Sequence, residues 1–150
     1  MKKETLLKVS SFLALVFSFL AAIFLLITPW SYWWYSYRAG GWHYYGSGTV
    51  GVWTVGVGPF IILTSLLLFI CAIISILTLI PGKIRSKTPL LISLILALVA
   101  LILIVIGAII TAAMMAGEDL YWSFGSGFYG SISGTILTVI FTAIMIVSKE

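Results

Sequence analysis

Few side chains in this sequence could do chemistry, and their spacing does not favour it. Glu118 and Asp119 are adjacent, so their carboxylates point in different directions and are unsuited to a general acid–base pair. The only histidine, His43, could join them in a metal site or a polar contact, and Arg38 could form a salt bridge with either carboxylate. Both carboxylates are more simply interpreted as solvated loop residues. Motifs for nucleotide binding, nucleophilic catalysis and zinc hydrolysis are absent.

We therefore predict no catalytic residue, no metal site and no cofactor, and the protein is expected not to be an enzyme. The composition supports this, because 62% of the 150 residues are hydrophobic and 8% are charged. An average soluble domain is roughly 45–50% apolar and about 25% charged. So few charges cannot solvate a 150-residue globule, which excludes a soluble enzyme and a nucleic-acid-binding domain. The formal net charge of +4 comes from basic residues at the ends of apolar runs, which is a membrane pattern.

Four apolar runs are each long enough to cross a hydrocarbon core about 30 Å thick, which takes about 20 residues. They cover residues 6–28, 59–80, 89–115 and 124–147. Prolines mark their ends, as expected of a residue that starts or stops helices. The sequence predicts an all-α membrane protein, one four-span domain over residues 1–150. Its loops would be 29–58 and 116–123 on one side and 81–88 on the other.

The basic residues predict the orientation of these spans. Seven of the eight lysines and arginines precede the first span, lie in the 81–88 loop or follow the last span: Lys2, Lys3, Lys8, Lys83, Arg85, Lys87 and Lys149. Only Arg38 falls on the other side. The positive-inside rule then places both termini and the 81–88 loop in the cytoplasm. We expect a multi-pass protein of the cell (plasma) membrane, with loops 29–58 and 116–123 outside.

Small residues predict how the helices pack, because association in lipid depends on close approach. The fourth span has one at every fourth position, on one helix face: Ser126, Gly130, Gly134, Thr138 and Thr142. Similar rows occur in the other spans, at Ser10, Ala14, Ser18 and Ala22, at Cys71 and Ser75, and at Ala108, Ala112 and Ala116. We expect the rows of the first and fourth spans to pack within one bundle. The alternative is that the fourth-span row is a dimer face.

The spans contain no Asp, Glu, Arg or His, and Lys8 is their only charged residue. Ionisable groups inside the membrane are the usual mark of proton relays and ion-coupled transport. Their absence argues against a pump, an antiporter and a haem or metal subunit. A pore lined by serine, threonine and backbone groups remains compatible with the pattern.

Loop 29–58 concentrates the aromatic residues, with five of the six tryptophans. Ser31–Arg38 is dense in aromatics that favour strands, and Ala39-Gly40-Gly41 predicts a turn. Trp42–Tyr45 is expected to return as a second strand and Thr49–Val55 as a third. The loop is therefore predicted to form a small antiparallel β cap on the helix bundle.

Two interpretations apply to the aromatic residues. Those next to span ends are typical of the belt at membrane–water boundaries: Trp30, Trp33, Trp34, Tyr121, Trp122 and Phe124. The others, with the single outer arginine, either pack under the cap or form a recognition surface, since Trp, Tyr and Arg dominate protein interfaces. This candidate interaction surface consists of Arg38, Trp42, Tyr44, Tyr45 and Trp53.

The order of three features is shared with a known group. Trp30 follows the first span, the triplet Gly51-Val52-Trp53 lies late in the outer loop, and Gly125–Gly130 opens the last span. With its four spans, the chain resembles the claudin and peripheral-myelin-protein tetraspans. Claudins bridge two cysteines just after the triplet, whereas Thr54 and Val55 follow here. The resemblance implies a compact bundle, an outer sheet and an adhesion or assembly role. Paracellular ion selectivity does not carry over, because the loop has almost no charge.

Together these features predict a structural or interaction protein whose aromatic cap contacts another protein, in the same membrane or on a facing surface. Its partners would be the lipid bilayer and either a protein or a second copy, through the outer loop or the fourth span. Nucleic acid is not an expected partner. Two alternatives of other classes are open. One is a small pore or carrier for an uncharged or lipophilic solute, and the other is an accessory subunit of a larger membrane complex.

Overall fold

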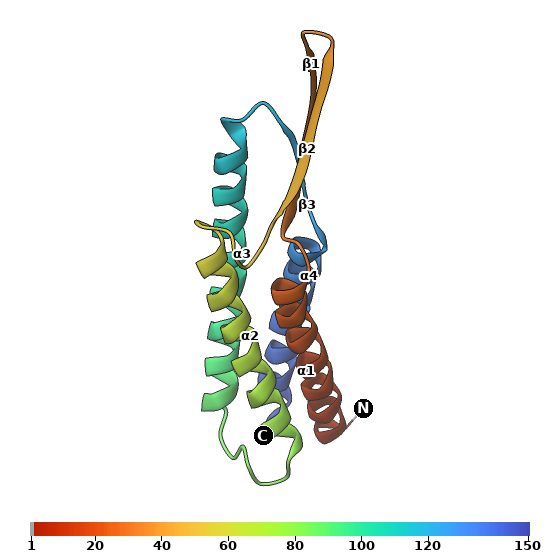
Figure 1. The fold of residues 1–150 in the computed structure, drawn as a ribbon. Coiled ribbons are helices and arrows are strands. Elements are labelled where there is room, and N and C mark those ends of the chain that lie inside the picture. The colour runs from red at the N-terminus through yellow and green to blue at the C-terminus, as the bar shows by residue number, and fades with distance from the viewer. Residues whose placement is uncertain (1) are drawn as a thin grey trace.

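The computed structural model describes residues 2–150 and contains four helices and three strands (Figure 1). In chain order these are α1 (Lys3–Ile27), β1 (Ser31–Ala39), β2 (Trp42–Val50), α2 (Gly58–Leu79), α3 (Thr88–Ala116), β3 (Tyr121–Phe124) and α4 (Ser126–Ser148). All four helices are long and apolar enough to cross a membrane. The predicted helix bundle is therefore confirmed. The largest difference from the expected boundaries is at α1, which begins at Lys3 rather than at residue 6.

The helices form a closed ring in which each contacts two others. α1 packs against α2 and α4, and α3 packs against the same two helices. Both termini and the loop from α2 to α3 lie at one end of the bundle, and the strands lie at the other, the sheet end (Figure 1). At the end opposite the sheet, Lys149 Nζ donates to the Ile84 carbonyl at 2.8 Å. The seven basic residues named above therefore share one end, and Arg38 lies at the other.

The buried face of α3 differs from the expected one. Ala116 is exposed and Ala108 and Ala112 are half-buried, so the predicted small-residue row does not form the contact face. The buried face consists of Leu90, Ser93, Ala97, Ala100, Ile104, Gly107, Thr111 and Met115. These residues recur every three or four positions, the spacing of a helix that follows its neighbours along its length. Size alone misled the prediction, because this face alternates large and small residues.

The sheet has the strand order β2-β1-β3, and both pairs are antiparallel. β1 and β2 pair over nine residues each, from Ser31↔Val50 to Ala39↔Trp42. The two residues between them, Gly40 and Gly41, have φ angles of +57° and +81°. Positive φ at both positions is what a tight type I′ hairpin turn requires. The predicted turn is confirmed.

The predicted third strand is wrong, because β2 ends at Val50 and the chain then turns. The side-chain oxygen of Thr54 accepts the N–H of Gly51 at 3.0 Å, and the N–H of Thr54 donates to the Gly51 carbonyl at 3.0 Å. Gly56 adds a positive φ of +96°. These turns carry the chain to the start of α2. The third strand is β3, which lies in the connection between α3 and α4, so the sheet is built from both connections at this end of the bundle.

β2 runs further than expected, through two glycines that would ordinarily weaken a strand. The rings of Tyr35 and Trp33 on β1 lie across Gly46 and Gly48. A methyl group on either glycine would lie 2.5 Å from the facing ring. Aromatic side chains on the neighbouring strand thus cover the glycines, which offsets the missing side chains. This cover fixes the positions of both rings.

We expect Gly41→Val to destabilise the hairpin by about 1–2 kcal/mol, because a left-handed backbone is costly for a residue with a Cβ. Hydrogen exchange of the β1 and β2 amides measures the effect, and protection should fall most near the turn. Gly41→Asn is the control, since asparagine tolerates this conformation. Equal protection in the valine and asparagine variants would contradict the turn geometry.

Candidate functional site

The β1–β2 hairpin is the most prominent feature of the sheet end. Nine residues in each strand correspond to a length of about 30 Å. β3 pairs only with the first four residues of β1, from Ser31↔Phe124 to Trp34↔Tyr121. The outer half of the hairpin therefore continues without a third strand, and it extends past the ends of all four helices (Figure 1).

The sheet has two different faces, because side chains alternate along a strand and paired residues share a face. We call one the ladder face, where rings stack in sequence: Trp33 with Tyr35 at 6.3 Å, Tyr35 with Tyr37 at 6.1 Å, and Tyr37 with Tyr44 at 5.0 Å between centroids. The other is the histidine face, which carries Ser36, Arg38, His43 and Tyr45 on the outer half of the hairpin. The ladder face is therefore a row of aromatic rings in contact, whereas the histidine face combines polar side chains with an aromatic ring.

On the histidine face, the Ser36 hydroxyl and Nε2 of His43 share a hydrogen bond of 2.7 Å. Arg38 lies directly opposite His43 on the neighbouring strand. Within residues 2–150, Arg38 forms no ion pair with Glu118 or Asp119, and no group of three potential metal ligands occurs. The salt bridge and the metal contact considered from the sequence are therefore not formed.

Four of the five candidate interaction residues lie together on the outer half of the hairpin. Trp42 is 72% exposed and Tyr45 is 81% exposed, on opposite faces, and Tyr44 and Arg38 are also exposed. The fifth, Trp53, is 93% exposed but lies in the loop that leads into α2. The structure thus gathers Arg38 and three aromatic residues at the tip and places Trp53 elsewhere.

Trp30 is a correction to the predicted aromatic belt, because it is buried, with 2% exposure. Its Nε1 donates to Thr111 Oγ1 at 2.8 Å, and Thr111 donates in turn to the Gly107 carbonyl at 2.8 Å. Its ring meets those of Phe124 and Phe128 edge-on, at 6.3 and 5.2 Å. Trp30 is therefore a core residue that joins the base of the sheet to α3 and α4.

The other predicted belt residues divide into two groups. Trp33, Trp122 and Phe124 are half-buried and pack against the cluster around Trp30. Trp34 and Tyr121 are exposed and stack on each other, with centroids 6.0 Å apart. The difference arises because β1 and β3 alternate their side chains between the core and the outside. Distance from a span end along the chain carries no information on that alternation.

Gly130 and Gly134 of α4 face α1. A methyl group on Gly134 would lie 2.8 Å from the Ala21 side chain, and one on Gly130 would lie 2.9 Å from the Phe24 ring. Thr138 and Thr142 have no exposed surface, whereas Ser126 at the start of the helix is exposed. Sequence reasoning missed Gly127, where a methyl group would lie 2.8 Å from the Pro29 carbonyl. Such close packing along α4 counts against a solute path there.

A cavity of about 610 Å³ lies beside the base of the hairpin and was not expected from the sequence. Its lining comes from β1 and from the loop between α3 and β3: Trp33, Tyr35, Ser36, Tyr37, Glu118, Asp119 and Leu120. We call it the β1–loop groove. No signal in the sequence locates it, because it forms where β3 stops pairing with β1.

Comparison with known proteins leaves the family open. No protein-family model matches this chain, and no curated protein is significantly similar to it. What the chain does has to follow from the chemistry of its own surfaces, since a fold alone hosts many functions. Two surfaces carry that chemistry: the outer half of the hairpin and the β1–loop groove.

Proposed function

We propose that this chain is a non-enzymatic, multi-pass membrane protein that associates with another protein through the outer half of its hairpin. The observation that carries the proposal is the exposure of Trp42 and Tyr45 at the tip, 72% and 81%. Large exposed aromatic residues contribute most of the energy in protein interfaces when a partner covers them. The role is one of adhesion or assembly, similar to that of claudins.

Open strand edges support the same proposal. In the part of the chain that the structure describes, no strand pairs with the outer edge of β2, and β3 leaves β1 unpaired beyond Trp34. Long edges of this kind, without proline, accept a strand from another chain. A partner that adds a strand to β2 would gain main-chain hydrogen bonds along the edge and cover the rings beside it.

The membrane orientation of the proposal rests on charge. Four apolar helices and seven basic residues at the end opposite the sheet fit the positive-inside rule. In this arrangement both termini are cytoplasmic and the hairpin projects from the outer face of the plasma membrane. The proposed partner is then a protein in the same membrane or on a facing surface.

Crosslinking in intact cells tests the association. A photoreactive amino acid in place of Tyr44 should capture a reproducible partner, identified by mass spectrometry. Adding Trp42→Ala and Tyr45→Ala should lower the crosslinked yield at least tenfold, because about 2 kcal/mol or more is typical of interface hot spots. Trp53→Ala is the matched control, since this exposed tryptophan lies away from the hairpin.

Three outcomes are distinct. Capture of a different protein supports the proposal directly, and capture of the same chain supports association between copies. The proposal fails if alanine at Arg38, Trp42, Tyr44 and Tyr45 together leaves every association of the protein intact in gentle detergent extracts. It also fails if the photoreactive residue captures nothing although the protein is folded and at the cell surface.

A further inference from the structure

The β1–loop groove has the form of a small-molecule site. It opens at the end of the β1–β3 pairing, where the chain leaves Tyr121 and turns away toward α3. Its volume of about 610 Å³ falls within the roughly 300–1,000 Å³ typical of ligand pockets. An adjoining cavity of about 390 Å³ shares Ser36, Tyr37 and Glu118–Leu120 with it. The groove is therefore large enough for a ligand of several heavy atoms.

One wall of the groove is aromatic and held in place. Trp33 and Tyr35 stack nearly parallel, with an interplanar angle of 4°, and Tyr37 continues the stack. The first two rings also lie against the backbone of Gly48 and Gly46, so little reorganisation is needed when a ligand arrives. Aromatic rings attract a cation placed within about 6 Å of their faces.

The other wall is acidic. Glu118 and Asp119 line the groove, and no lysine, arginine or histidine does. The turn that carries them is fixed by the Leu120 N–H, which donates to the Glu118 carbonyl at 2.9 Å. Among residues 2–150 the ion pairs are Lys3–Glu150 and Lys8–Glu4, so neither groove carboxylate has a cationic partner. The lining thus has a formal charge of −2 beside an aromatic surface.

We propose that the β1–loop groove binds a small organic cation, with a primary or quaternary ammonium group seated between the aromatic wall and the two carboxylates. An anion would be repelled by Glu118 and Asp119, and a neutral solute would gain nothing from their charge. A metal ion is less suited to the site, because two carboxylates and aromatic rings leave most of its coordination positions unfilled. The cation could be free or the headgroup of a lipid, since both present the same ammonium chemistry.

Calorimetric titration of the purified full chain tests the site, in maltoside micelles that contain no ammonium group. Choline is the probe, and 3,3-dimethylbutan-1-ol is its neutral counterpart of the same shape. We expect choline to bind at least about tenfold more tightly, since cation–π and charge attraction are both lost in the alcohol. Equal binding of the two molecules would overturn the proposal.

Variants locate the binding. Glu118→Gln with Asp119→Asn should weaken choline binding about tenfold or more, and Tyr37→Leu should weaken it several-fold while Tyr37→Phe keeps it. Trp53→Leu is the matched control, because Trp53 is an exposed aromatic residue that lies in the loop leading into α2, outside the groove lining. These positions are exposed, so the variants should keep the helical circular dichroism of the parent. Unchanged binding in the Gln/Asn variant would place the cation elsewhere and overturn the proposal.

The source of the cation is separated by reconstitution. The titration is repeated in nanodiscs of phosphatidylcholine and of uncharged digalactosyl diacylglycerol. Binding in the glycolipid discs that disappears in phosphatidylcholine supports a lipid headgroup as the occupant. Binding in both supports a free cation, and binding in neither overturns the proposal. The groove contains neither Trp42 nor any residue of β2. Cation binding can therefore be refuted while the protein association holds, and the association can be refuted while cation binding holds.

Discussion

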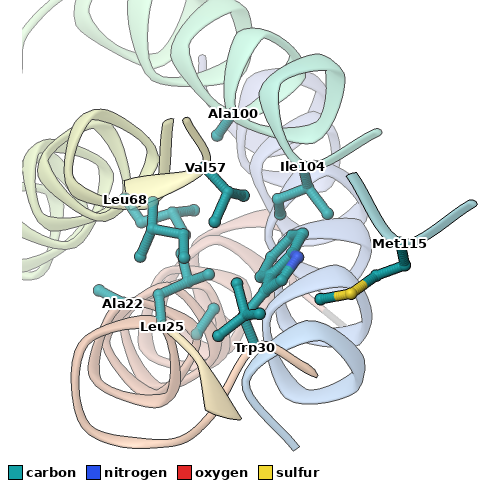
Figure 2. Close-up of a cluster of buried hydrophobic side chains, with 11 residues drawn as sticks. Ala22, Leu25, Trp30, Val57, Leu68, Ala100, Ile104 and Met115 are labelled. Atoms are coloured by element: carbon teal, nitrogen blue, oxygen red, sulfur yellow. The ribbon is translucent and has the colours of Figure 1, made fainter. Parts of the chain in front are cut away.

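Replacing Trp30 by alanine should lower the free energy of unfolding by about 3–5 kcal/mol, the range for deleting a large buried aromatic side chain. Trp30 lies at the centre of the cluster at the sheet end, between Leu25, Val57 and Ile104 (Figure 2). Its indole also ties the loop after α1 to Thr111 on α3, through a hydrogen bond of 2.8 Å. The substitution therefore removes both packing and a connection between sheet and bundle.

Equilibrium unfolding in mixed maltoside and dodecyl sulfate micelles, followed by circular dichroism, measures this loss. Trp53→Ala makes the same chemical change at a side chain that is 93% exposed, and it should alter stability by less than about 0.5 kcal/mol. Trp30→Phe should fall between the two, since it keeps most of the packing and loses the N–H donor. Equal stability of the Trp30→Ala and Trp53→Ala variants would contradict the placement of Trp30 in the core.

This pair of tryptophans shows where sequence reasoning stops. Trp30 and Trp53 are the same residue type, and both lie within a few residues of a helix end. Trp30 is buried because Gly107 on α3 leaves room for its ring and Thr111 accepts its N–H. That complementarity joins residues far apart in the chain. No local sequence pattern reveals this contact between Trp30 and α3. The sequence therefore predicted an interfacial role for Trp30 and an interaction role for Trp53.

The helices and the hairpin turn were predictable because their signals are local. Each helix contains an apolar stretch that is long enough to cross a membrane. The Gly40-Gly41 pair sits between two aromatic-rich segments and has the positive φ angles that a two-residue hairpin needs. Such features depend only on neighbours in sequence, so a single chain is enough to identify them.

The third strand and the groove depend on tertiary structure. Thr49–Val55 alternates in the manner of a strand, but the turn at Gly51 and Thr54 ends it. The four residues of β3 were too short to be recognised, and their pairing with β1 follows from the closeness of α1 and α4. The groove forms where that short pairing ends. Its aromatic and acidic walls therefore come from segments that the sequence alone could not bring together.

Gly134→Val should strongly destabilise the contact between α1 and α4. A Cβ at this position would lie 2.8 Å from that of Ala21 and 3.0 Å from the Phe17 carbonyl, and valine adds two further methyl groups. Because one of these neighbours is backbone, α1 and α4 must separate. We expect a loss of about 3 kcal/mol, the upper part of the range for overpacking a dense core. Unfolding in mixed micelles measures it.

A compensating pair identifies the cause of that loss. Gly134→Ala should be destabilising alone, and adding Ala21→Gly should recover part of the stability, because it removes the nearer contact and leaves the Phe17 carbonyl. Ala113→Val is the control for the valine variant, since it adds two methyl carbons at an exposed position of α3.

The same variants decide between the two uses of the α4 row that the sequence left open. If the row packs within one chain, Gly134→Val lowers the stability of the monomer, and Ala21→Gly rescues Gly134→Ala in a monomeric sample. If the row is instead a dimer face, Gly134→Val changes the oligomeric state in micelles and leaves monomer stability near that of the parent. That second result would contradict the contact between Gly134 and Ala21 within the chain.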